Sequence, residues 1–107
     1  MTKLQDLPRD PQGYLLNFGD WDPSIAEEIA GEEQITLTEE HWELIHFVQD
    51  FYREYNTTPA MRLLVRAVKE KFGEEKGSSR YLYRLFPEGP AKQICKIGGL
   101  PKPVKCI

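Results

Sequence analysis

The sequence has little of what small enzymes commonly use for chemistry. Its 107 residues include only two cysteines and two histidines. It contains no HExxH sequence, no glycine-rich phosphate loop and no serine in a G-x-S-x-G sequence. The cysteines and histidines match no familiar zinc-ligand spacing, so we expect no metal site and no cofactor. The two thiols are therefore the groups whose chemistry can be argued.

Long apolar runs are also absent. No stretch approaches the roughly 18 consecutive apolar residues of a membrane span, and the opening "MTKLQDLPRDPQGY" is too polar and too proline-rich for a targeting leader. We therefore expect one cytoplasmic domain without a membrane partner. In that compartment cysteines are more often reactive or incidental than joined in a structural disulfide.

The charged residues are unevenly distributed along the chain. Residues 1–60 carry three basic and thirteen acidic side chains, whereas residues 61–107 carry eleven basic and four acidic ones. Such a split is typical of a basic face that attracts an acidic partner, either nucleic acid or protein. A dipolar surface that is merely solvated fits the charges alone equally well.

Apolar periodicity and capping residues predict a mainly α-helical fold. Helices are expected from Pro23 to Gly31, from the Thr38 cap to about Tyr55, from the Thr58 cap to Gly73, from Ser78 or Ser79 to Pro87, and from Pro90 to Gly98. The helix after Thr38 is apolar on more than one side, which predicts a central position. Its two histidines are expected to be ordinary, partly buried side chains. The first twenty residues indicate a strand pair or an extended arm.

The predicted third helix carries a basic stripe opposite its apolar face. Arg62, Arg66 and Lys69 are spaced to lie on one side of it. A helix, a short turn and a basic second helix are similar to a helix-turn-helix layout, so a nucleic-acid-binding module is one alternative. The net acidity of the chain and the lack of a long basic run argue against it.

The last stretch, "KQICKIGGLPKPVKCI", contains both thiols eleven positions apart. Gly98 and Gly99 predict a hinge, and the prolines that follow favour an extended chain, so residues 98–107 are expected to form a mobile arm beyond a domain of residues 1–97. Fully extended, the eight residues from Gly99 to Cys106 span at most about 26–29 Å. An arm of this length carries the Cys106 thiol far enough to enter the active site of another protein.

The two thiols have different surroundings in the sequence. Lys102 and Lys105 flank Cys106 and favour its thiolate, while the chain's own carboxylate opposes it. Cys95 lies on the last predicted helix, where the helix dipole disfavours a thiolate, so it suits a resolving role better than an attacking one. Two alternatives stay open for Cys95: a small buried residue without function, or half of a regulatory Cys95–Cys106 disulfide.

In these residues the chain resembles the DsrC/TusE family of sulfur-carrier proteins. The similar segments are "GYL", "LTEEHWELIHFVQDFYREYNTTPAMRLLV", "FGEEKGSSRYLYRLFPEGPAKQ" and, most specifically, "GLPKPVKCI". The resemblance implies a small, mainly helical fold with a short N-terminal β-hairpin at about residues 4–20 and a mobile arm. It also implies that Cys106 carries sulfur as a persulfide.

The family has two branches with different partners. TusE-like members accept sulfur from a TusBCD-type complex and pass it, with a tRNA-thiolating enzyme, toward the wobble uridine of certain tRNAs. DsrC-like members serve dissimilatory sulfite reductase and use both cysteines. The tail "PKPVKCI" is similar to the TusE branch, whereas Cys95 points to the DsrC branch. We favour the TusE branch.

The expected function is therefore that of a sulfurtransferase that acts as a relay. Its basic side chains would dock an acidic partner surface or the tRNA bound to the partner. The expected docking residues are Arg62, Arg66, Lys69, Arg80, Arg84, Lys92, Lys96, Lys102 and Lys105.

Overall fold

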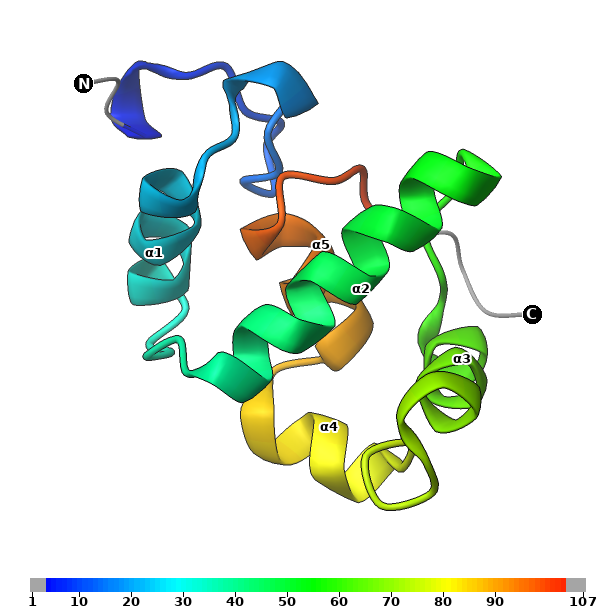
Figure 1. The fold of residues 1–107 in the computed structure, drawn as a ribbon. Coiled ribbons are helices and arrows are strands. Elements are labelled where there is room, and N and C mark those ends of the chain that lie inside the picture. The colour runs from blue at the N-terminus through cyan, green and yellow to red at the C-terminus, as the bar shows by residue number, and fades with distance from the viewer. Residues whose placement is uncertain (1–3, 104–107) are drawn as a thin grey trace.

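Short helices make up nearly all the regular structure of residues 4–103, the part of the chain that the computed structural model describes (Figure 1). The elements are the 3-10 helices η1 (Leu4–Asp6) and η2 (Phe18–Asp20) and the α-helices α1 (Pro23–Glu32), α2 (Glu39–Tyr55), α3 (Met61–Phe72), α4 (Ser79–Leu85) and α5 (Pro90–Ile97). The prediction of a mainly α-helical fold is confirmed. No helix in this range is long and apolar enough to cross a membrane.

Most helix ends follow from their capping residues. The Asp22 carboxylate accepts the backbone N–H of Ile25 at 2.9 Å and begins α1 directly before a proline. The Ser78 hydroxyl accepts the backbone N–H of Tyr81 at 3.2 Å and begins α4. Gly73 ends α3 with a positive φ of 99°, a conformation that glycine adopts without strain. These boundaries are local, and the sequence predicts them.

The start of α3 differs from the prediction. The helix begins at Met61 with Ala60 as its cap, rather than after Thr58. Thr58 is only 4% exposed, and its hydroxyl donates to the backbone carbonyl of Lys102 at 3.5 Å. The Thr58 side chain is therefore used in a contact with a distant segment and does not cap the helix.

The N-terminal segment contains very little β-structure. The hairpin expected at about residues 4–20 is reduced to one antiparallel bridge between Arg9 and Leu15. The chain reverses there because the Asp10 carboxylate accepts the N–H groups of Gln12 and Tyr14 at 2.8 and 2.9 Å. The 3-10 helices η1 and η2 lie on either side of this bridge, so the pairing does not continue into longer strands.

Helix α5, and not α2, lies at the centre of the packing. The helices α1, α2, α3 and α4 all contact it, and Figure 1 shows α5 behind α2 and beside α1. Within α5 only Lys92 and Lys96 are not buried. Helix α2 packs on the core through one side and leaves a second apolar side, which includes Phe51 and Tyr55, at the surface. A helix of eight residues gives a weak periodic signal, so its central position comes from the tertiary structure.

His41 joins two helices. Its Nδ1 accepts the backbone N–H of Thr38 at 3.1 Å, so the proton is on Nε2, which donates to the Leu85 carbonyl at 2.9 Å. The start of α2 is thereby tied to the end of α4. His41 is 7% exposed, as expected for an ordinary buried histidine. His46 is exposed, so the expectation that both histidines are partly buried is wrong for His46.

Candidate functional site

The turn after α5 belongs to the folded body. The Ile97 carbonyl accepts the indole Nε1–H of Trp21 at 2.8 Å, and the Gly98 carbonyl accepts the side-chain amide of Gln49 at 2.9 Å. Buried carbonyls that receive such bonds hold the backbone in place, because breaking the bonds would leave polar groups unpaired. The turn is thus anchored both to α2 and to the segment before α1.

Gly99 and Leu100 complete this packed turn. Gly99 has φ +73°, and a Cβ atom there would lie 2.6 Å from Cδ1 of Trp21. The Leu100 side chain is completely buried, and its N–H donates to the Cys95 carbonyl at 2.8 Å. The packed core therefore includes Leu100, and the division into a domain of residues 1–97 and an arm of residues 98–107 stays a prediction. The hinge role of Gly98 and Gly99 stays a prediction.

Beyond the packed turn, the chain returns to the surface. Pro101 and Lys102 are exposed and Pro103 is half-buried. Cys106 and Lys105, the predicted persulfide carrier and one of the lysines beside it, lie outside the described residues, and their roles stay predictions.

Cys95 is enclosed by the core. Its side chain is 1% exposed, and burial raises the pKa of the thiol to about 12, with the nearby Thr58 hydroxyl acting in the opposite direction. The thiol is therefore protonated at neutral pH and out of contact with solvent. Only a thiolate attacks a disulfide or persulfide, so Cys95 is not a nucleophile in this arrangement.

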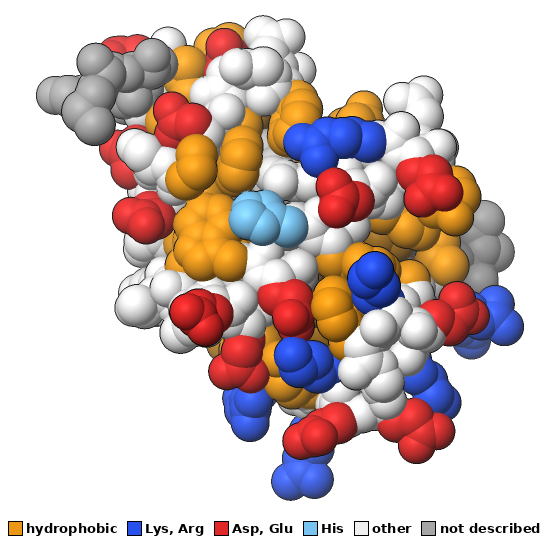
Figure 2. Space-filling model, in the orientation of Figure 1, with side chains coloured by type: hydrophobic (Ala, Val, Ile, Leu, Met, Phe, Trp, Pro, Cys, Tyr) orange, Lys and Arg blue, Asp and Glu red, His pale blue; other side chains and the backbone are white. Residues whose placement is uncertain are grey.

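Most of the basic residues expected to dock a partner lie on α3, α4 and α5, and several of them already have acidic partners. Lys69 pairs with Glu74 at 3.8 Å, and Arg84 pairs with Glu40 at 3.7 Å. The other exposed members of the set are Arg62, Arg66, Arg80, Lys92 and Lys102. Figure 2 shows one face of the molecule, and on that face basic side chains alternate with acidic ones. Their docking role stays a prediction.

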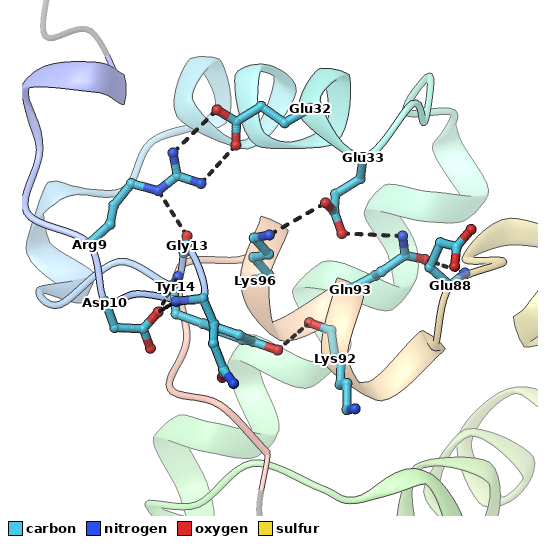
Figure 3. Close-up of polar contacts among 11 residues, drawn as sticks. Arg9, Asp10, Gly13, Tyr14, Glu32, Glu33, Glu88, Lys92, Gln93 and Lys96 are labelled. Carbon is cyan, nitrogen blue, oxygen red and sulfur yellow. Dashed lines mark hydrogen bonds and ion pairs between the residues drawn. The ribbon is translucent and has the colours of Figure 1, made fainter.

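Lys96 belongs to a polar cluster that holds α1 and the N-terminal segment against α5 (Figure 3). Its ammonium lies 3.4 Å from the Glu33 carboxylate, and both side chains are largely buried. The buried amide of Gln93 donates to the same carboxylate at 3.4 Å. The Tyr14 hydroxyl donates to the Lys92 carbonyl at 3.4 Å, and burial raises the Tyr14 pKa to about 12. Lys96 therefore already has an internal partner.

Sequence reasoning missed the side chains that anchor the turn. Gln49 was identifiable as a polar residue among the apolar positions of α2, a pattern typical of a buried hydrogen bond. Trp21 and Thr58 offered no such signal, because their partners are more than forty positions away. Among residues 4–103, no group of three or more His, Cys, Asp or Glu side chains is arranged to hold a metal ion.

Comparison with known proteins identifies the family. The family model described as "DsrC like protein" matches residues 2–107. The chain therefore belongs to the DsrC-like family.

Curated relatives indicate the activity. "Sulfurtransferase TusE" of Photorhabdus laumondii is 63% identical over 96% of this chain and 93% of the relative. The protein of the same name from Escherichia coli K12 is 59% identical over 96% and 94%. At this identity over nearly the whole length, the chain is a sulfurtransferase.

Solved structures of the family have the same fold. The NMR structure of Allochromatium vinosum DsrC has a TM-score of 0.86 and 50% identity, with 94% of this chain and 90% of that chain covered. The oxidized gamma-subunit of the dissimilatory sulfite reductase (DsrC) from Archaeoglobus fulgidus has a TM-score of 0.79 and 39% identity, with 94% and 92% covered. These likenesses confirm the predicted fold class.

Proposed function

We propose that this protein is a cytoplasmic sulfur relay in which Cys106 accepts sulfur from a TusBCD-type donor complex. The sulfur then passes to a tRNA-thiolating enzyme that modifies the wobble uridine of its bound tRNA. The proposal is supported by the identity of about 60% to sulfurtransferases named TusE. The tail "GLPKPVKCI" supports it as well, because it resembles the tail of TusE-like sulfur carriers.

The burial of Cys95 carries the proposal. The chain has two cysteines, and Cys95 is 1% exposed with a thiol pKa of about 12. Exchange of sulfur requires an accessible thiolate, and Cys95 offers neither the access nor the charge. This burial supports the proposal that Cys106 carries the sulfur.

The relay consists of two exchanges at sulfur. The Cys106 thiolate attacks the outer sulfur of a donor persulfide, the donor S–S bond breaks, and the donor leaves as a thiolate. Cys106 then holds that sulfur as its own persulfide. An acceptor thiolate attacks the same outer sulfur and restores the Cys106 thiolate. No net oxidation or reduction accompanies either exchange.

The packed turn sets the reach of the proposed carrier. Because Leu100 is fixed in the core, the segment between it and the Cys106 thiol is at most the six residues from Pro101 to Cys106. Fully extended, these residues span at most about 20–22 Å, shorter than the reach expected for an arm beginning at Gly99. We therefore place the partner's reactive thiol in a cleft of that depth or less.

The second candidate is a DsrC-like partner of dissimilatory sulfite reductase that uses both cysteines. It is favoured by the presence of Cys95 and by the likeness to the Allochromatium vinosum structure. This function requires Cys95 to leave its buried site under Thr58 and react with Cys106. The two candidates therefore differ in whether Cys95 is needed.

Sulfur loading separates the candidates. We expect the wild-type protein, incubated with a persulfide-bearing donor and measured by intact mass spectrometry, to gain one sulfur atom. Cys106→Ser should gain none, because the nucleophile is lost. Cys95→Ala should load sulfur and support tRNA thiolation as the wild-type protein does. Loading of the Cys106→Ser variant would refute the carrier role, and a Cys95→Ala variant inactive in transfer would favour the second candidate.

The exposed basic residues are proposed to strengthen docking of the relay partners. Surface charges act mainly on the rate of association and are screened by salt. Binding to the tRNA-thiolating enzyme should therefore weaken as the salt concentration rises. Salt-sensitive binding of tRNA by this chain alone would favour the helix-turn-helix alternative instead.

A further inference from the structure

An apolar groove lies between the C-terminal half of α2 and the outer side of α3. Phe47, Phe51 and Tyr55 line it from α2, and Leu63 and Ala67 line it from α3. Tyr55 is 58% exposed and Leu63 is 43% exposed. Figure 2 shows apolar side chains exposed in this region, with acidic and basic side chains beside them. The groove residues recur at helical spacing, so each helix presents a continuous apolar row.

The groove stays open because α3 packs on α5 and makes little contact with α2. The two helices meet at Phe47 and Phe72, whose rings lie edge to face with centroids 5.4 Å apart. Farther along α2, Phe51 and Tyr55 lie with ring centroids 4.7 Å apart. The aromatic row of α2 is thus held in place within the chain, and its outer surface is available to a second molecule.

The charges along the groove limit what fits it. Asp50 and Glu54 stand on the α2 side, while Arg66 and Lys71 stand on the α3 side together with Glu70. Asp50 pairs with the neighbouring Arg53, but Glu54 has no ion-pair partner within residues 4–103. An occupant with an apolar ridge and basic side chains along its α2-facing flank matches this pattern.

The groove is next to the beginning of the C-terminal arm. Thr57 lines the groove, and the following residue, Thr58, donates to the Lys102 carbonyl and contacts Cys95. A protein bound in the groove is therefore adjacent to the point where the chain leaves the core. A relay partner needs this arrangement, because it must hold the carrier's body while the thiol at the tip reacts.

We propose that this groove binds an amphipathic helix of a protein that exchanges sulfur with Cys106. The apolar ridge of that helix packs between Tyr55 and Leu63, and its basic flank faces Glu54. This inference rests on the proposed relay function and adds a docking site at a distance from the reacting thiol.

The test measures binding of the full chain to two purified proteins, the TusBCD-type donor complex and the tRNA-thiolating enzyme, by isothermal titration calorimetry. Leu63→Glu places a charge in the apolar groove, and we expect at least about tenfold weaker binding to one or both proteins. Leu16→Glu is the matched control, since Leu16 is 61% exposed and outside the groove. Its effect should stay within about twofold.

Two further variants test whether weaker binding by Leu63→Glu comes from the groove itself and not from misfolding. Tyr55→Ala removes an apolar groove side chain that is 58% exposed and should weaken binding in the same direction. Glu54→Lys should weaken it more at low salt than at high salt. Circular dichroism of each variant establishes that the fold is retained. Wild-type affinity in Leu63→Glu and Tyr55→Ala, or the absence of wild-type binding to both proteins, would overturn the proposal.

Two measurements distinguish a partner helix in the groove from self-association and from a loss of thiol reactivity. Sedimentation of the chain alone tests whether a second copy of the chain occupies the groove. If the wild-type protein is a dimer and Leu63→Glu is a monomer, the groove binds a second copy, and the proposal of a partner helix is overturned. Loading from a low-molecular-weight persulfide needs no docking, so Leu63→Glu should load normally from it and slowly from the donor complex. If Cys106→Ser loads sulfur, the relay function fails while the binding result for the groove still stands.

Discussion

Two consecutive pieces of the C-terminal stretch both contain helix-ending residues but have opposite environments. Residues 97–100 are buried, whereas Pro101 and Lys102, which follow directly, are exposed. Both pieces are rich in residues that end helices. In the first piece, Gly99 permits a positive φ and close contact with Trp21. The stretch is thus an anchor followed by an exposed segment.

The anchor determines how the site can work. Hydrogen bonds from Trp21 and Gln49 hold the carbonyls of the turn, and Cys95 lies beneath it in the core. On the proposed relay, the segment that carries Cys106 begins at this fixed point, whereas burial raises the pKa of the Cys95 thiol to about 12. The following predictions test this difference between the anchor and the exposed segment.

The largest effect is expected at Leu100. Leu100→Ala removes a completely buried side chain and should lower the free energy of unfolding by about 2–5 kcal/mol. Lys102→Ala, two residues along and exposed, should change it by less than about 0.5 kcal/mol. Urea denaturation followed by circular dichroism measures both. Equal effects would mean that the anchor does not end at Leu100.

A smaller loss is expected at Gly99. Gly99→Ala forces a methyl group against Trp21 at a positive φ and should cost about 2–3 kcal/mol of unfolding free energy. Gly31 in α1 provides the matched control, because nothing lies within 4 Å of the position that a Cβ atom would occupy there. Gly31→Ala should stabilise the protein by up to about 1 kcal/mol. A neutral Gly99→Ala would show that the turn is not held as described.

The smallest effect concerns the pH dependence of Cys95. Its folded-state pKa is raised from 9.0 to about 12, so its contribution to stability is complete below pH 9 and is lost as the pH rises toward 12. Between pH 8 and 9.5 the wild-type protein should lose about 1 kcal/mol more than Cys95→Ala does. Tyr14 also titrates in the alkaline range, but it does so in both proteins.

Reagent access gives an independent reading of the same thiol. In a Cys106→Ser background, labelling of Cys95 by a thiol reagent should be slow at pH 8 and complete on addition of denaturant, because burial keeps the thiol neutral. Rapid labelling of the native protein would contradict the enclosed position of Cys95.

Helix ends defined by local chemistry could be predicted, and those that depend on distant partners could not. Asp22, Ser78 and Gly73 act within one turn of their own helices. Thr58 resembles a cap by its position before a proline, yet its hydroxyl is used by the carbonyl of Lys102. The basic residues illustrate the same limit. A lysine such as Lys96 is expected at the surface, but its side chain is largely buried and pairs with Glu33.

The sequence by itself determined the helical class of this protein, its capped helices and a tail that identifies a sulfur-carrier family. These features depend on periodicity and on residues adjacent in the chain. Only the tertiary structure decided that α5 is central, that the packed core includes Leu100, and that Cys95 and Thr58 are enclosed. These facts depend on which distant side chains fill the same space, and burial in turn raises the pKa of the Cys95 thiol.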